Sequence, residues 1–239
     1  MSKGETQSLD ENTRRYYLNV MGIQCWQSID DQQAREDQAD VSPLENSDRD
    51  VAVVDISNVE EAIRQCTKCP LHKVRKQPLA GRGKLSAELM FVVLAPSTSD
   101  DKSGVICSGD ANVLLTKMLA AIDIDIKDVY LSSLLKCNVP ATHTVSPAEI
   151  QSCDEHLQQQ IQQIQPKLLV VLGETAARCL LQKDLSIDDF RAMNDEMPNT
   201  VAAVPLFVSY SPEELIGQPE NKRKAWSDLQ QLQKFIKAN

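Results

Sequence analysis

Short apolar runs alternate with longer amphipathic segments along most of this sequence, and this pattern limits the fold more than any other feature. The apolar runs are Leu89–Ala95, Val129–Leu135, Lys167–Leu172 and Val204–Tyr210. The segments with helical periodicity are Ala111–Ile122, Ser146–Ile164, Glu174–Leu181 and Glu220–Ile236. Continuous apolar runs separated by helices are typical of strands buried on both faces of a parallel sheet. The sequence therefore predicts a three-layer α/β fold, in which helices flank a mainly parallel four-stranded sheet.

The first part of the chain differs from the rest in composition. Asp30–Asp50 is acidic and has almost no large apolar side chains, so burial cannot offset the entropy of ordering it. Arg14–Ser28 instead concentrates aromatic and aliphatic side chains near helical spacing, which indicates an amphipathic helical tail. We therefore expect an N-terminal segment at residues 1–29, a flexible acidic linker at 30–57 and one folded domain at 58–239.

The charge balance disfavours binding to nucleic acid. The formal net charge is -9 at pH 7 and the sequence pI is about 4.9, so the summed field repels phosphate groups. The basic side chains between Lys68 and Lys84 are interpreted as solvated surface. No stretch approaches the roughly 20 apolar residues of a bilayer span, and the polar start, Met1–Asp10, does not follow a signal-peptide pattern. These features predict a cytoplasmic protein with weak or absent DNA binding.

Four of the seven cysteines have a spacing that suggests a metal site. An odd number of cysteines in a reducing compartment argues against a disulfide framework. Cys66 and Cys69 form a CxxC pair in a loop, Cys137 follows the second predicted strand, and Cys153 lies in the next predicted helix. Four thiolates that converge in this way suit zinc or an iron–sulphur cluster equally well. The remaining cysteines, Cys25, Cys107 and Cys179, are interpreted as small buried hydrophobic residues.

The order of motifs from Cys66 onward resembles that of the family-4 uracil-DNA glycosylases. The matching segments are Cys66–Leu71 (CTKCPL), Gly81–Gly83, Leu89–Asn112, Asp128–Cys137 (DVYLSSLLKC), Ile164–Lys167, Leu172–Ala177, Ser209–Pro212 and Pro219–Asp228. The resemblance implies a uracil-DNA glycosylase-like fold. It also implies a [4Fe–4S] cluster, because the family's four ligand positions are all cysteine here: Cys66, Cys69, Cys137 and Cys153.

The positions that match the family's catalytic residues carry other side chains. Leu94 stands for the carboxylate and Cys107 for the aromatic ring that stacks on the base. Ser133 stands for the amide that reads the uracil edge, and Ser211 for the histidine near the developing anion. Loss of one such group typically costs about two to four orders of magnitude in rate. We therefore predict that the chain has no catalytic residues at these positions and is inactive.

A second resemblance lies near the N-terminus. Leu18–Trp26 is similar to the N-terminal peptide of the psi subunit of the DNA polymerase III clamp loader. The psi subunit has a fold related to that of the uracil-DNA glycosylases but no catalytic activity. This likeness implies that the segment docks on the clamp-loader ATPase subunits and that the folded domain binds the chi subunit. Aromatic and aliphatic anchors on a tether are suited to such docking. The predicted partner-binding residues are Tyr17, Leu18, Met21, Gly22, Ile23 and Trp26.

Our interpretation from the sequence is thus a psi-like adapter of DNA replication with an iron–sulphur cluster. The alternative is an active DNA-repair glycosylase with a divergent site for uracil or another damaged base. A third interpretation, a redox sensor that uses the cluster, has no independent support in the sequence.

Overall fold

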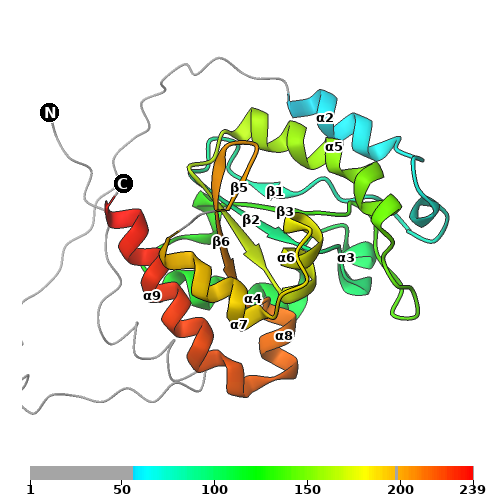
Figure 1. Cartoon of the computed structure of the whole chain (residues 1–239). Helices are drawn as coiled ribbons and strands as arrows, with labels where there is room; N and C mark the ends of the chain where they lie inside the picture. Colours follow the sequence, from blue (N-terminus) through cyan, green and yellow to red (C-terminus); the bar gives the residue numbers. More distant parts are fainter. Residues whose placement is uncertain (1–55, 197–198, 239) are drawn as a thin grey trace, which may run out of the picture.

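The computed structural model describes residues 56–196 and 199–238, and a twisted sheet forms the centre of this part (Figure 1). The strand order is β1-β3-β2-β4-β6-β5. Neighbouring strands among β3, β2, β4 and β6 pair in parallel, whereas β1 and β5 pair antiparallel at the two edges. The bounds are Arg82–Gly83 (β1), Leu89–Val93 (β2), Tyr130–Ser133 (β3), Leu168–Leu172 (β4), Thr200–Val201 (β5) and Val204–Ser209 (β6).

Helices cover both faces of the sheet, which gives three layers (Figure 1). The α-helices are α2 (Ile56–Arg64), α3 (Thr98–Ser103), α4 (Gly109–Ala120), α5 (Pro147–Ile164), α6 (Glu174–Leu181), α7 (Ile187–Ala192), α8 (Pro212–Gly217) and α9 (Lys222–Ala238). Short 3-10 helices are η1 (Pro70–Lys73), η2 (Ile126–Asp128), η3 (Met193–Asp195) and η4 (Pro219–Asn221). The helix α2 packs against α5 and belongs to the helical layer on the same side of the sheet (Figure 1).

Successive side chains of each strand point to opposite faces of the sheet, so the core has two halves, one on each face. On β2, Phe91 packs with α4 and α9 on one face, while Met90 and Val92 pack with α5 and α6 on the other. The same alternation holds along β3, where Leu131 faces α4 and Tyr130 faces α5. Every residue of β4 is buried, as expected for a central strand between two helical layers.

The predicted fold class is confirmed, with one correction to the sheet. The four predicted strands are β2, β3, β4 and β6, and the four predicted helices are α4, α5, α6 and α9. The sheet has six strands rather than four, because β1 and β5 contain only two residues each and have no periodicity to detect. The N-terminal segment and nearly all of the linker lie outside the described residues. Within the described part, none of the helices could span a bilayer.

Candidate functional site

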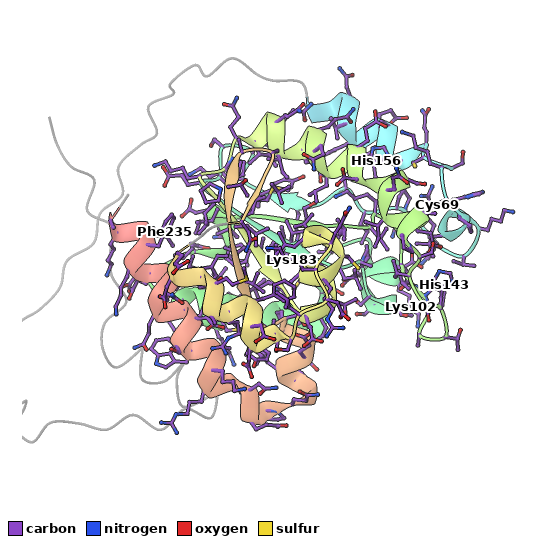
Figure 2. All side chains as sticks on the ribbon, in the orientation of Figure 1. Cys69, Lys102, His143, His156, Lys183 and Phe235 are labelled. Atoms are coloured by element: carbon purple, nitrogen blue, oxygen red, sulfur yellow. The ribbon has the colours of Figure 1, made fainter. Side chains whose placement is uncertain are left out.

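Two regions contain the residues that the sequence singles out. The first is the cysteine corner, which we define as Cys66, Cys69, Cys137 and Cys153. Cys66 and Cys69 lie between α2 and η1, Cys137 follows β3, and Cys153 lies on α5. Cys137 and Cys153 are buried in one small core cluster, and half-buried Cys69 packs against it. The loop with Cys69 projects on the side opposite to Phe235 of α9 (Figure 2).

Basic side chains surround the cysteine corner. Arg75 donates to the Cys137 sulphur at 2.9 Å and to the Cys66 carbonyl oxygen at 2.8 Å, so one guanidinium joins two cysteine segments. The backbone N–H of Lys136 donates to the Cys153 sulphur at 3.3 Å. Burial raises the pKa of the Cys153 thiol to about 11. The metal-free thiol is therefore protonated at neutral pH, and a metal would displace this proton on binding.

The four thiols of the cysteine corner are a donor set that suits either zinc or an iron–sulphur cluster. In the described part of the chain, no three His, Cys, Asp or Glu side chains are grouped closely enough to hold one metal ion. One turn after Cys153, His156 is only 3% exposed, and neither of its ring nitrogens has a hydrogen-bond partner among the residues that the structure describes. An unpartnered buried imidazole beside this corner is consistent with a further acceptor there.

The second region is the strand-end site, which we define as Leu94, Cys107, Ser133 and Ser211. Leu94 follows β2, Ser133 ends β3, and Ser211 follows β6, so these three lie where parallel strands end. Cys107 lies just before α4 and packs in the same core half as Tyr210. Ligands of open α/β sheets bind at the carboxyl ends of the strands. The structure therefore brings the four predicted positions to the edge where a substrate would bind.

Ser133 has an unpartnered hydroxyl at this edge. The side chain is fully buried, and within the described part of the chain its Oγ has no hydrogen-bond partner. The preceding residue, Ser132, donates to Gln160 of α5 at 2.7 Å. Because successive strand residues point to opposite faces, Ser133 faces the α4 side, where Cys107 packs. Buried hydroxyls usually find a partner, so this one is suited to a ligand.

Asp100 shapes the loop that carries Cys107. Its carboxylate accepts hydrogen bonds from the backbone N–H groups of Ser97 (3.0 Å), Cys107 (3.1 Å) and Ser108 (2.7 Å). These bonds hold Cys107 at a φ of 52°, in the left-handed region that non-glycine residues rarely adopt. Burial, followed by the nearby Glu213 charge, raises the pKa of Cys107 to about 12. The neutral thiol therefore presents a small apolar surface rather than a nucleophile.

Ser211 is the N-cap residue of α8, and its hydroxyl can still donate a hydrogen bond. Its Oγ accepts from the Glu214 N–H at 3.1 Å, and Glu214 in turn accepts from the Ser211 N–H at 2.9 Å. A hydroxyl that accepts in this way can still donate its own proton. Arg191 forms an ion pair at 2.7 Å with the buried carboxylate of Asp228, which also accepts a hydrogen bond from the Ser209 hydroxyl. This network fixes the end of β6.

Comparison with known proteins identifies the family. The profile of the uracil DNA glycosylase superfamily matches residues 80–230, which is more than half of the 239 residues. The chain belongs to this superfamily. A type-4 uracil-DNA glycosylase of Thermotoga maritima is 32% identical over 182 residues, which cover 75% of this chain and 93% of the relative. The type-4 uracil-DNA glycosylase of Archaeoglobus fulgidus is 30% identical over 181 residues, covering 74% and 91%. These matches place the chain with the type-4 family.

The prediction of an inactive clamp-loader adapter is wrong. The relatives that cover about three quarters of the chain are named glycosylases, in agreement with the alternative drawn from the sequence. The prediction rested on four side-chain positions alone. Backbone N–H groups and side chains at other positions of the same edge can also stabilise charge and orient water.

Several predicted residues lie outside the described part of the chain. These are Tyr17, Leu18, Met21, Gly22, Ile23 and Trp26, and docking through them stays a prediction.

The basic side chains between Lys68 and Lys84 are not all solvated, because some of them form hydrogen bonds that hold the fold together. Arg75 contacts the cysteine corner. Arg82 donates to the carbonyl oxygen of Ile106, in the loop before α4, and to the side-chain oxygen of Asn112, in the first turn of α4. The sequence reveals basic composition here but not these long-range partners.

Proposed function

We propose that this protein is a DNA glycosylase that hydrolyses the N-glycosidic bond of uracil or a related damaged base. The observation that carries the proposal is the buried, unpartnered hydroxyl of Ser133 at the strand ends of a glycosylase-superfamily fold. A base flipped out of DNA presents a polar edge that such a hydroxyl can bind. The type-4 relatives support uracil as the first substrate to test.

The residues of the strand-end site divide the task as follows. Ser133 hydrogen-bonds the polar edge of the flipped base, and the neutral thiol of Cys107 contacts its apolar face. As the glycosidic bond breaks, negative charge develops on the departing base. The Ser211 hydroxyl is placed to donate its free proton to that charge, because its acceptor side is already used by Glu214.

The cysteine corner has a structural role in this proposal. Cys66, Cys69, Cys137 and Cys153 would hold a [4Fe–4S] cluster, which supplies a covalent tie between the α2–η1 loop, the end of β3 and α5. Ser133 and Cys137 lie on the same strand-to-loop segment. A tie at Cys137 therefore holds the end of β3, and with it the hydroxyl that binds the base.

The proposal is tested by incubating purified protein with oligonucleotides that carry one uracil, hypoxanthine or thymine at the same position. Alkali then cleaves any abasic strand, and gel electrophoresis measures the cut fraction. We expect cleavage of a damaged-base strand and none of the thymine strand. The protein is produced in a host that lacks its own uracil-DNA glycosylase, so that contamination cannot supply activity. Intact strands for every base would contradict the proposal.

A further inference from the structure

Acidic side chains gather at the carboxyl edge of the sheet, although Leu94 supplies none. They are Asp100, Asp101, Glu174, Glu213 and Glu214. Hydrolysis of a glycosidic bond needs a group that orients water and accepts its proton, a role for which carboxylates are suited. The question is which of these five is free for that task.

Four of the five carboxylates are committed to the fold. Asp100 accepts three backbone N–H groups, as described above, and Asp101 accepts those of Lys76 and Gln77 at 2.9 and 3.0 Å. Glu174 accepts the Ile187 N–H at 2.9 Å and pairs with Arg178. Glu214 accepts the N–H groups of Glu174 and Ser211, which joins the start of α6 to that of α8.

Glu213 is the exception. Within the described residues, no ion pair and no hydrogen bond joins its side chain to another residue; its only partner is its own backbone N–H. It lies two residues after Ser211, on the first turn of α8, and α8 packs against α4. Its charge acts on Cys107, at the start of α4, so it lies close to the loop of the strand-end site.

The surroundings of Glu213 suit a proton acceptor. Its side chain is open to solvent, so water can reach it. The surrounding protein nevertheless raises its pKa by desolvation, and the charges of Asp100 and Glu214 raise it further. A carboxylate whose pKa is raised holds a proton more strongly and is a better base than one tied to several N–H donors. The unpartnered Ser133 hydroxyl at the same edge independently indicates a ligand there.

We propose that Glu213 is the catalytic carboxylate of this chain, which orients the hydrolytic water and accepts its proton. This inference rests on the proposed glycosylase function. The water oxygen forms a bond to C1′ of the deoxyribose, and the bond between C1′ and the base nitrogen breaks. Its electron pair leaves with the base, the water proton passes to the Glu213 carboxylate, and the sugar becomes an abasic site with a C1′ hydroxyl. Proton return from Glu213 to the departed base or to solvent completes the cycle.

The test compares Glu213→Gln with Glu220→Gln, which makes the same change at an exposed glutamate of η4. Single-turnover release is measured on the base that the wild-type protein removes. Binding is measured separately on DNA with a 2′-fluoro nucleotide, which resists cleavage. We expect Glu213→Gln to slow release by about 100-fold or more, as for loss of a general base, while binding changes less than about threefold. Glu220→Gln should match the wild-type protein in both measurements.

The pH profile gives a second readout. Because the pKa of Glu213 is raised, its carboxylate takes up a proton at a higher pH than an ordinary glutamate. Release by the wild-type protein should therefore fall as the pH drops through that raised pKa, and Glu213→Gln should lack this acid limb.

The outcomes separate this inference from the function on which it rests. Release by Glu213→Gln within threefold of wild type overturns the inference alone. An equal loss of binding and release also overturns it, because Glu213 would then hold DNA rather than water. A wild-type protein that releases no base overturns the proposed function and this inference together.

Discussion

The cysteine corner and the strand-end site differ in how far they match the motifs of the family that the sequence resembles. By that resemblance, the cysteine corner has a thiol at all four ligand positions, whereas the strand-end site has other side chains at the four positions that define it. The four ligands of one cluster bind a single group, so a change at one of them affects the whole centre. The groups that bind a base and orient water are separate side chains, so each can be replaced by a group on a neighbouring element.

Residue identity at fixed positions is therefore expected to be a stronger guide to a metal centre than to a reaction. Leu94 cannot orient water, yet Glu213 lies at the same edge of the sheet. Variants of the two regions test this difference separately.

Cys137→Ala should lose most of the iron of the proposed cluster, because it removes one of the four proposed ligands together with the Arg75 contact. The brown colour and the bound iron should be lost, and the free energy of unfolding should fall, since bound metal contributes to folding. Iron analysis and chemical denaturation measure both effects. Cys179→Ala is the matched control and should keep its iron, because Cys179 lies on α6, outside the core cluster that contains Cys137 and Cys153. Iron that persists in Cys137→Ala would break the ligand assignment.

Asp228→Asn should destabilise the support of the strand-end site without affecting iron. The change removes the more buried of the two carboxylates that pair with the Arg191 guanidinium and leaves Asp188, which is 52% exposed. Breaking a buried pair is strongly destabilising, and with Asp188 still paired we expect a loss of about 2 kcal/mol. Urea unfolding measures the difference in the free energy of unfolding between the variant and the wild-type protein. Asp184→Asn is the matched control, because Asp184 is 92% exposed in its pair with Arg178 and should contribute less than about 1 kcal/mol. Equal values for both variants would contradict a structural role of the buried pair.

Ser133→Ala and Ser132→Ala should have opposite effects. Removing the unpartnered Ser133 hydroxyl should leave stability unchanged or raise it by about 1 kcal/mol, while base release falls roughly tenfold. Ser132 faces α5, where its hydroxyl contacts both Gln160 and Lys136. Ser132→Ala should therefore lose about 1 kcal/mol of stability and keep its base release. The reverse pattern would show that the base binds on the other face of the sheet.

The sequence predicts the central fold well, because its strands and helices have strong periodicity. It also anticipates that Cys137 and Cys153 lie near Cys69, as their shared core cluster shows, whereas the convergence of all four cysteines on one cluster stays a prediction. It does not distinguish Glu213 from Glu214, which are adjacent at a helix start. Only the folded chain shows that Glu214 accepts two N–H groups, whereas the Glu213 side chain, among the described residues, bonds only to its own backbone N–H. The sequence also does not reveal the roles of Asp100 and Arg75. Asp100 accepts backbone N–H groups of a loop, and Arg75 contacts Cys137, which is distant in sequence.

The most direct test of the account is the identity of the released product. The wild-type protein is mixed with DNA that carries a single uracil, and free base is quantified by mass spectrometry alongside abasic sites in the DNA. Hydrolysis of the glycosidic bond predicts one free uracil for each abasic site formed, and none from the matching thymine DNA. DNA that remains intact, with no free base from uracil or any other damaged nucleotide, would contradict the claim that this chain is a glycosylase.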